Sequence, residues 1–167
     1  MLNIVFWNVH GLPDHKLDDD VFSSLCCKYD IHVVGLTETM KQDSPRNLPG
    51  YSSPFVISSK KLKTCGRNSG GILIYVKPHI RKGLTRVKQT NFSIWFKLDN
   101  KTLGLQRTFY ICFCYITPYQ KKETSEQSFS KLENEIAFFK CKEDIRVCGD
   151  LNARTCGMKD CFAFRQY

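Results

Sequence analysis

The stretch that decides the fold begins with IVFWN at residues 4–8 and ends with VVGLTE at residues 33–38. Ile4 to Trp7 is a short apolar run, typical of a buried strand. Asp18-Asp19-Asp20 follows, where carboxylates suit the N-terminus of a helix. The spacing of one helical face then recurs at Phe22, Leu25, Cys26 and Tyr29. Ile31 to Leu36 is the next apolar run, so the β-α-β order predicts a parallel strand pair in an α/β domain.

Further strands are expected downstream at Ile72–Val76, Ser93–Leu98, Phe109–Ile116 and Asp144–Cys148. Ser125 is expected to cap a helix whose buried face comprises Phe129, Leu132, Ile136 and Phe139. Residues 40 to 69 are rich in Pro, Ser, Gly and Lys and are expected to form a long irregular passage. No internal repeat or linker divides the 167 residues, and this length suits one domain.

The charge of the chain is unevenly distributed. The formal net charge is +9, and no acidic residue occurs between Asp43 and Asp99, an interval with eleven Lys and Arg. Such a one-sided stretch favours a polyanion, because neutralising phosphates releases condensed counterions. The alternative is a solvated basic face without a partner. If a partner exists, we expect a polyanion, bound by the basic segment 44–98.

Composition and the lack of targeting features in the sequence also bear on where in the cell we expect the protein. Hydrophobic residues make up 42% of the chain, which is enough for a core and argues against disorder. The N-terminus lacks the basic and apolar regions of a secretory signal, and no apolar run has the length of a membrane span. The nine cysteines show no C-x-x-C pair, so buried thiols are favoured over structural zinc. We expect an intracellular protein, the nucleus included, that is neither secreted nor bound to a membrane.

Polar side chains stand where the predicted strands end. Asn8 follows the first strand and Glu38 follows the second. Tyr115 lies near the end of the run 109–116, and both Asp150 and Asn152 follow the last strand. Chemistry collects at such ends in α/β sheets, because the loops there converge on one crevice. These residue types fit the hydrolysis of a phosphodiester.

Each of the five residues has a candidate role. Mg²⁺ prefers carboxylate oxygen, so Glu38 is a candidate metal ligand that Asn8 supports. Asp150 could orient or deprotonate a water, while Asn152 and Tyr115 could donate to the phosphate as charge develops. Each also has a plain alternative: a solvated or capping Glu, a core Tyr, and a Gly-Asp-x-Asn sequence that is only a turn. Spacing alone predicts an α/β domain, with phosphate binding as one option.

Five blocks of sequence occur in the order of a known family. They are Phe6-Trp7-Asn8-Val9-His10-Gly11-Leu12, Gly35-Leu36-Thr37-Glu38-Thr39, Ser69-Gly70-Gly71-Ile72, Cys114-Tyr115-Ile116-Thr117-Pro118 and Cys148-Gly149-Asp150-Leu151-Asn152-Ala153-Arg154-Thr155. Together they resemble the endonuclease/exonuclease/phosphatase superfamily, which includes apurinic endonucleases and pancreatic deoxyribonuclease. Within it they most resemble the endonuclease domain of LINE-type (non-LTR) retrotransposons.

The resemblance implies a four-layer α/β sandwich, with two facing β-sheets flanked by helices. It implies a Mg²⁺ or Mn²⁺ site, and the nicking of one DNA strand to leave a 3′-hydroxyl that primes reverse transcription. The expected partner is therefore DNA, bound through its phosphate backbone by the basic segment 44–98. By motif, Asn8 and Glu38 fall on metal-site positions and Tyr115 on the catalytic tyrosine. Asp150 falls on the water-orienting aspartate, and Asn152 on the phosphate-binding asparagine. Ser69-Gly70-Gly71 matches a structural glycine pair at the start of a central strand.

Two departures from the family pattern shape the expectations. At the position of His10, apurinic endonucleases usually have an aspartate that helps hold the metal. We interpret His10 as a loop residue rather than a ligand, which favours the retrotransposon subgroup. The family's late Ser-Asp-His element is missing after residue 156, and residues 157–167 match nothing in the family. We therefore expect residues 1–156 to form the N-terminal portion of the domain, with a divergent tail, weak or no activity, and a tendency to self-associate.

Three functions remain open from the sequence. The first is a metal-dependent DNA endonuclease, and the second is a non-catalytic module that binds nucleic acid. The third is a mobile-element remnant without a selected role. A reverse transcriptase fused in the parent polyprotein fits the first, whereas target-site preference and oligomeric state are left undecided.

Overall fold

In the computed structural model, residues 2–13, 17, 20–41, 47–61, 68–117 and 122–152 are described. Their elements, in chain order, are β1 (Ile4–Asn8), α1 (Asp20–Lys28), β2 (Val33–Thr37), β3 (Phe55–Ile57), β4 (Lys60–Lys61), β5 (Asn68–Ser69), β6 (Ile72–Val76), α2 (Pro78–Arg81), β7 (Leu84–Gln89), β8 (Ser93–Leu98), α3 (Asn100–Leu103), β9 (Phe109–Tyr115), α4 (Lys122–Lys140) and β10 (Asp144–Asp150).

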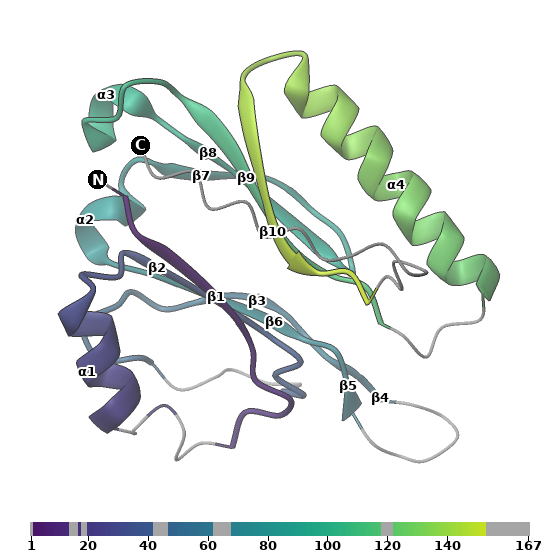
Figure 1. Cartoon of the computed structure of the whole chain (residues 1–167), viewed down its shortest axis with the longest axis horizontal. Helices are drawn as coiled ribbons and strands as arrows, with labels where there is room; N and C mark the ends of the chain where they lie inside the picture. The colour runs from purple at the N-terminus through teal and green to yellow at the C-terminus, as the bar shows by residue number, and fades with distance from the viewer. Residues whose placement is uncertain are drawn as a thin grey trace, which may run out of the picture.

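Eight of these strands form two four-stranded sheets that face each other. One sheet has the order β1-β2-β6-β3, and the other has the order β10-β9-β8-β7. Each has one parallel pair, β1 with β2 and β9 with β10, and its other pairs are antiparallel. Helix α1 covers the outer face of the first sheet and α4 that of the second (Figure 1). The expected four-layer α/β sandwich is therefore confirmed.

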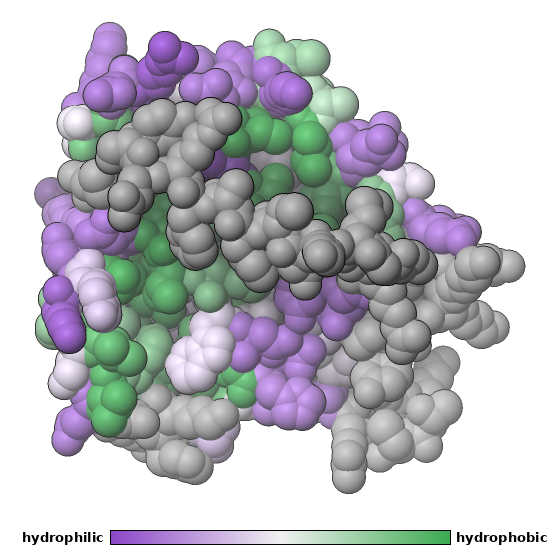
Figure 2. Space-filling view, viewed as in Figure 1, coloured by the Kyte–Doolittle hydropathy of each residue, from purple (hydrophilic) through white to green (hydrophobic). Residues whose placement is uncertain are grey.

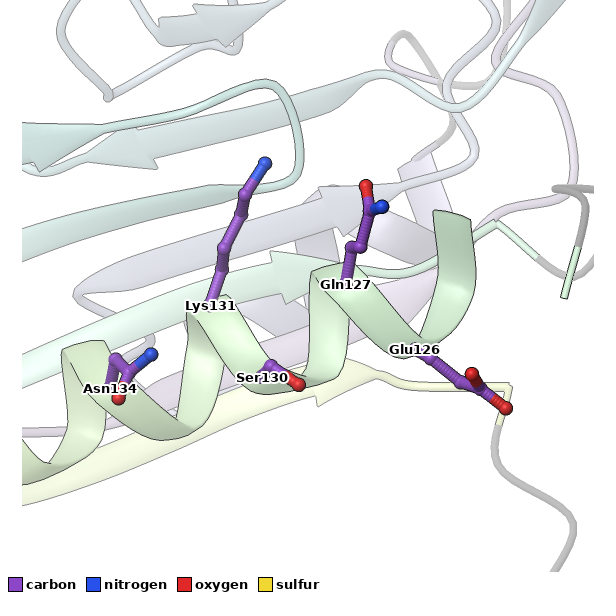
Figure 3. A pocket seen from close by; sticks show the side chains of 5 residues that line it. All are labelled: Glu126, Gln127, Ser130, Lys131 and Asn134. Carbon is purple, nitrogen blue, oxygen red and sulfur yellow. The ribbon is translucent and has the colours of Figure 1, made fainter. Parts of the chain in front are cut away.

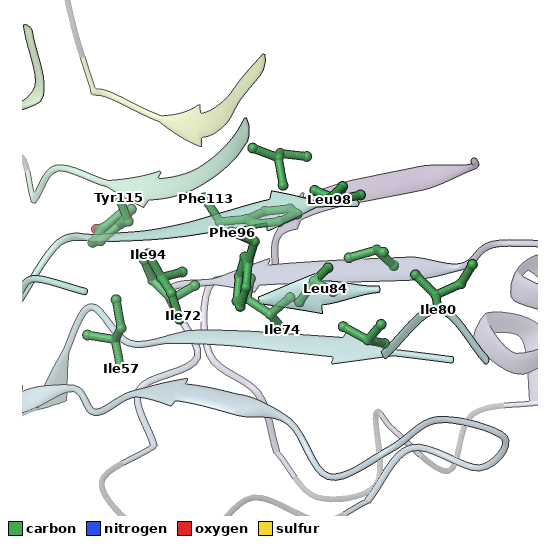
Figure 4. Packing of buried hydrophobic residues seen from close by; sticks show 13 residues of the cluster. Ile57, Ile72, Ile74, Ile80, Leu84, Ile94, Phe96, Leu98, Phe113 and Tyr115 are labelled. Carbon is green, nitrogen blue, oxygen red and sulfur yellow. The ribbon is translucent and has the colours of Figure 1, made fainter. Parts of the chain in front are cut away.

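Strand β6 shows how the sequence divides its side chains between the layers. Successive strand residues point to opposite faces. Ile72, Ile74 and Val76 therefore pack between the sheets, while Leu73 and Tyr75 pack beneath α1. All five are buried, because a central strand covered on both faces carries apolar residues throughout. Figure 4 shows the inter-sheet core that results.

Helix α4 packs on the second sheet as its periodicity predicts. Leu132 and Phe139 are buried, and Phe129 and Ile136 are half-buried against the same cluster. The Phe139 ring stacks on Trp95 of β8 with a centroid separation of 4.5 Å. Such an aromatic pair contributes about 0.5–1.5 kcal/mol beyond the burial of its area. The helix begins at Lys122, however, so the expectation of a cap at Ser125 is wrong.

Residues 40 to 69 were predicted to be irregular throughout, but part of this passage forms strands. It contains β3, which pairs with β6, and the two-residue strands β4 and β5, which pair with each other. Strand β7 was also missed. Its residues after Leu84 are exposed, so no apolar alternation marks a strand that backbone pairing with β8 holds in place.

Two further findings concern the surface. None of the helices described is both long and apolar enough to cross a bilayer. On the face viewed in Figure 2, hydrophobic residues reach the surface between the two sheets. Leu2, Ile4, Phe6 and Cys148 pack against the inter-sheet core and are only partly buried. Residues 153–167, which include the expected divergent tail, lie outside the described part of the chain.

Candidate functional site

Strand registers bring the ends of two parallel pairs to one end of the sandwich. Asn8, the last residue of β1, is paired with Thr37 of β2, and Glu38 directly follows Thr37. In the facing sheet, Asp150 of β10 is paired with Tyr115 of β9. Asn152 lies two residues beyond β10. All five side chains singled out in the sequence therefore lie at carboxyl ends of strands.

Two side-chain hydrogen bonds join the sheets at this end. Asn8 Nδ2 donates to Asp150 Oδ2 at 2.7 Å. Tyr115 Oη donates to Glu38 Oε1 at 2.8 Å. In each bond the carboxylate belongs to one sheet and its donor to the other. We call the five side chains, with His10, the strand-end cluster.

Asn152 and His10 complete the strand-end cluster. The backbone N–H of Asn152 donates to Asp150 Oδ1 at 3.0 Å, and its side-chain Nδ2 donates to the carbonyl of Ile116 at 2.8 Å. The backbone N–H of His10 donates to Asn8 Oδ1 at 3.1 Å. Its imidazole Nδ1 lies 2.9 Å from Glu38 Oε2, although the ring is largely exposed. His10 was interpreted as a loop residue, and its contact with Glu38 was not predicted.

Tyr115 serves two purposes. Its side chain is 6% exposed and packs in the inter-sheet core beside Ile72 and Ile94 (Figure 4). Its hydroxyl nevertheless reaches Glu38. A buried tyrosine usually finds a partner for its hydroxyl in this way. The core role considered from the sequence and the role in the cluster are therefore both present.

Glu38 is held as a carboxylate. Burial disfavours its charge and raises its pKa, but hydrogen bonds from Asn8, Tyr115 and His10 outweigh burial, so the net pKa lies below the usual value. Only 13% of the side chain is exposed. A partly buried carboxylate that is ionised near neutral pH can attract a cation.

The backbone around the cluster is strained. Among described residues other than glycine, five have positive φ, and four of these lie here: His10 (45°), Glu38 (53°), Met40 (56°) and Asn152 (48°). Such conformations cost about 1–3 kcal/mol each and concentrate at functional sites. The surrounding packing therefore holds these residues in positions that they would not adopt freely.

Gly70 and Gly71 support the Glu38 loop. Their carbonyls accept hydrogen bonds from the backbone N–H groups of Met40 at 2.9 Å and Thr39 at 3.4 Å. Gly71 has φ of +94°, and a Cβ there would lie 2.5 Å from Thr39 Oγ1. A side chain at Gly71 would thus displace the loop that presents Glu38.

The donor atoms of the cluster fit a hard divalent cation. Glu38 and Asp150 supply carboxylate oxygens, and Asn8 supplies an amide oxygen. Among the residues that the structure describes, no group of three or more His, Cys, Asp and Glu is gathered as in an all-protein metal cage. Mg²⁺ usually binds through one or two carboxylates and keeps waters and substrate phosphates as its other ligands. The strand-end cluster contains two carboxylates, Glu38 and Asp150, beside the amide of Asn8.

A depression on the surface of α4 is less suited to binding a substrate than the strand-end cluster. It has a volume of about 450 Å³ and is lined by Glu126, Gln127, Ser130, Lys131 and Asn134 (Figure 3). All five belong to α4 and are exposed. Because the described residues that line the depression all come from α4, no other described element encloses a ligand there.

Comparisons with known proteins match the fold but not the sequence. No family model and no curated protein matches this chain. Solved structures do match. An AP endonuclease from Leishmania major has a TM-score of 0.64 at 18% identity, and the match covers 90% of this chain and 55% of that one.

Two further structures give similar results. The human Nocturnin catalytic domain with bound sulfate has a TM-score of 0.60 at 18% identity, covering 92% of this chain and 64% of that one. An endonuclease/exonuclease/phosphatase family protein from Bacteroides thetaiotaomicron has a TM-score of 0.52 at 16% identity, covering 89% and 61%. These likenesses show that the chain has the fold of such proteins. It spans between 55% and 64% of their lengths.

Proposed function

We propose that this chain is a divalent-metal-dependent phosphodiesterase domain of the endonuclease/exonuclease/phosphatase superfamily, and that it nicks DNA as LINE-type retrotransposon endonucleases do. The observation that carries the proposal is the strand-end cluster, in which side chains up to 142 positions apart are hydrogen-bonded across two sheets. The fold shared with nucleases and the order of the five sequence blocks support it.

Glu38 and Asn8 would hold the cation, Mg²⁺ or Mn²⁺. The carboxylate of Glu38 is kept ionised by its donors, and Asn8 Oδ1 accepts a hydrogen bond from the backbone N–H of His10. A bound cation would withdraw charge from the phosphate and stabilise the leaving oxygen. Mutual repulsion between Glu38 and Asp150 would also fall.

Asp150 is the candidate to orient the attacking water. Both of its oxygens already accept hydrogen bonds, one from Asn8 and one from the backbone of Asn152, so the carboxylate has a fixed orientation. A fixed carboxylate can align a water and accept its proton. In the sequence Gly-Asp-x-Asn, Gly149 and Asp150 end strand β10, and the backbone N–H of Asn152 braces the catalytic candidate.

Tyr115 and Asn152 are the candidate donors to the phosphate. The hydroxyl of Tyr115 is aimed into the cluster by a ring fixed in the core. The amide of Asn152 is held beside Asp150 by its bond to Ile116. The Tyr115 hydroxyl has a single proton, which it donates to Glu38, so it would have to turn from Glu38 to the phosphate. Asn152 has a second amide hydrogen beside the one donated to Ile116, and removing such a preorganised donor typically costs about 10²–10³-fold in kcat.

DNA is favoured as the substrate by charge. Lys60, Lys82, Arg86, Lys88 and Lys97, all from the basic segment 44–98, are exposed. Exposed cations without intervening acidic residues attract a polyanion. The preference for DNA over a small phosphate ester, the retrotransposon-type nick and the nuclear site of action are parts of this proposal.

A nicking assay tests the proposal. Supercoiled plasmid is incubated with excess protein and Mg²⁺ or Mn²⁺, and conversion to the open circle is followed. The expected nicking disappears with EDTA and in Glu38→Gln and Asp150→Asn, which keep the size of each side chain. Lys101→Ala on α3, outside the basic segment, serves as the matched control and keeps wild-type activity.

Three outcomes decide the matter. Equal nicking by wild type and Glu38→Gln would overturn the assignment of the site. Hydrolysis of a phosphomonoester without nicking would replace the nuclease with a phosphatase. DNA binding without nicking in either metal would favour the non-catalytic binding module. The low activity expected from the sequence stays a prediction until this assay is done.

A further inference from the structure

One side of the sandwich is formed by the edge strands β1 and β10, and we call it the β1/β10 side. The bond from Asn8 to Asp150 joins these strands at their carboxyl ends. Among the residues that the structure describes, β1 pairs only with β2, and β10 pairs only with β9. Trp7 of β1 is 48% exposed and Val147 of β10 is 39% exposed. Each sheet therefore ends here in a strand with one described neighbour and an exposed apolar side chain.

The opposite side, formed by β3 and β7, has features that prevent edge strands from pairing with other chains. Strand β3 has three residues and directly follows Pro54. Strand β7 has an irregular register between Arg86 and Lys88, which are both exposed cations. Short strands, Pro, bulges and charged side chains are the usual protection of a sheet edge. Strand β10, in contrast, runs for seven residues in an unbroken register and contains neither Pro nor Lys. Of the two sides, the β1/β10 side is the one suited to backbone pairing.

The backbone of β10 is arranged to accept a further strand. The backbone N–H of Ile116 donates to the carbonyl of Asp150 at 3.0 Å. In a parallel ladder, this bond means that Asp150 and every second residue before it bond to β9. The residues between them direct their backbone groups away from β9; they are Ile145, Val147 and Gly149. Backbone groups that point out of a sheet edge are a template for another strand.

The charges on β10 are complementary to those of a second copy of this chain. Because successive strand residues alternate between faces, one face of β10 carries Asp144, Arg146, Cys148 and Asp150. An antiparallel pair of copies centred on Cys148 sets Arg146 of each copy opposite Asp150 of the other, which is stabilising. A pair centred on Val147 would instead set Asp144 opposite Asp150, and like charges in that position are destabilising. The charges therefore favour the register centred on Cys148.

The same register uses the outward backbone groups. It pairs Val147 of each copy with Gly149 of the other, and such antiparallel pairs exchange two N–H···O=C bonds each. A two-fold axis relates the copies, as in most protein dimers. Strand β1, which lies beside β10, has no charged residue and adds no repulsion between copies. An acidic partner, in contrast, would be attracted more strongly to the exposed cations of β7 than to β1.

We propose that two copies of this chain associate through their β10 strands, in an antiparallel pair centred on Cys148. This pairing joins the four-stranded sheets that contain β10 into one continuous sheet. It also brings Arg146 of the second copy opposite Asp150, so that the second copy places a cation at the edge of the strand-end cluster. The inference rests on the edge strands and not on the proposed hydrolysis.

Sedimentation velocity over a range of protein concentrations, under reducing conditions, measures the association. Wild type is expected to pass from monomer to dimer as its concentration rises. Val147→Lys is expected to raise the dissociation constant about tenfold, because it places an ammonium group in the pairing strand. Val87→Lys is the matched control, since Val87 is 40% exposed and lies on β7 at the other edge of the same sheet. Circular dichroism checks that both variants are folded.

The charge pairing has a test of its own. Arg146→Glu sets two acidic residues opposite each other in both halves of the pair and is expected to weaken the dimer at least as much as Val147→Lys. Arg146→Lys keeps the charge and is expected to retain most of the affinity. Equal effects of the two Arg146 variants would contradict the proposed register.

Cys148 tests the register directly. Residues opposite each other in antiparallel strands have Cα atoms about 4.5–5.5 Å apart, which lies within the range of a disulfide. Mild oxidation is expected to link Cys148 of one copy to Cys148 of the other, and peptide mapping identifies the linked residues. Cys148→Ser should remove this link. Cys141→Ser, which changes an exposed free cysteine outside β10, should leave it in place.

Three results would overturn the proposal. The first is a wild type that stays monomeric at every concentration, and the second is equal weakening of the dimer by Val147→Lys and Val87→Lys. The third is an oxidised dimer whose linked peptides do not contain Cys148. The proposed hydrolysis fails separately, because a monomer that nicks DNA removes the dimer alone, and a dimer that never nicks removes the hydrolysis alone.

Discussion

Glu135 of α4 offers a direct test of how the helix layer supports the site. Its side chain is 4% exposed. Its Oε2 accepts from the indole Nε1 of Trp95 at 2.7 Å and from Ser93 Oγ at 2.9 Å, and its Oε1 lies 3.0 Å from Lys88 Nζ. This carboxylate is the polar link between α4 and β8.

The expected cost of Glu135→Ala follows from those contacts. Trp95 is fully buried, so its N–H would lose its partner at a cost of about 1–3 kcal/mol. The Ser93 bond to a charged acceptor contributes about 1.5–3 kcal/mol. Lys88 is 45% exposed, so its ion pair contributes no more than about 1 kcal/mol. Because these contributions overlap at one group, we expect a total loss of about 3–5 kcal/mol.

Urea unfolding followed by circular dichroism measures the loss. A domain of this size has about 5–15 kcal/mol of stability, so Glu135→Gln is included in case the alanine variant does not fold. Its amide oxygen can still accept from Trp95 and Ser93, and we expect a loss of about 1–2 kcal/mol. Lys88→Ala is the matched control, with a loss below about 1 kcal/mol. A loss under 1 kcal/mol in Glu135→Ala, or equal losses in the alanine and glutamine variants, would refute the reasoning.

Three other predictions follow from single positions. Gly71→Ala should lower the free energy of unfolding by about 2–5 kcal/mol, because a positive φ and a clash with Thr39 combine there. Gly104→Ala, which has open space around it, should lower it by about 1–2 kcal/mol. Thermal denaturation compares the two variants. Burial lowers the pKa of His32, and its Nδ1 accepts a backbone N–H at 3.1 Å, so the unfolded chain takes up the proton more readily. Stability should therefore fall as pH drops below about 6.5, and His32→Gln should flatten that dependence in melting curves between pH 7.5 and 5. Strand β10 pairs with one described strand, β9, and exposes Val147. Val147→Lys should therefore reduce concentration-dependent self-association, which sedimentation runs measure. A strictly monomeric wild type would contradict this prediction.

Much of the sandwich was predictable because apolar residues mark most of its strands in the sequence. The runs containing β1, β2, β6, β8, β9 and β10 all stand out in the sequence, and the β-α-β order correctly predicted the parallel pairing of β1 with β2. Strands β4 and β7 escaped notice because mostly polar residues form them and backbone pairing holds them. Local patterns carry no signal for a strand of that kind.

The strand-end positions of the five cluster residues were also predictable, but their contacts were not. Parallel pairing places Asn8 beside the end of β2 and Asp150 beside Tyr115. The bonds from Asn8 to Asp150 and from Tyr115 to Glu38 depend on how the two sheets face each other, which periodicity does not encode. Only the resemblance to a family suggested that these side chains meet.

Glu135 could have been found from its spacing. It stands three residues after Leu132 and four before Phe139, so helical periodicity places it on the buried face. A charged residue on such a face implies buried partners. The contact of His10 with Glu38 had no comparable signal, because it depends on a left-handed backbone at a position occupied by neither Gly nor Asn.

The strand-end cluster also lies where the two sheets are hydrogen-bonded to each other, so the packing between the sheets affects the geometry of the site. Each carboxylate comes from one sheet and is held by a donor from the other. The separation of the sheets therefore sets the distance between Glu38 and Asp150. Gly35 of β2 contributes to that separation, because a Cβ there would lie 2.7 Å from the Phe113 ring, which packs in the inter-sheet core. A larger residue at Gly35 would push the sheets apart and lengthen both bonds of the cluster, since a close-packed core transmits such strain. The apolar residues between the sheets thus position the polar residues at their ends.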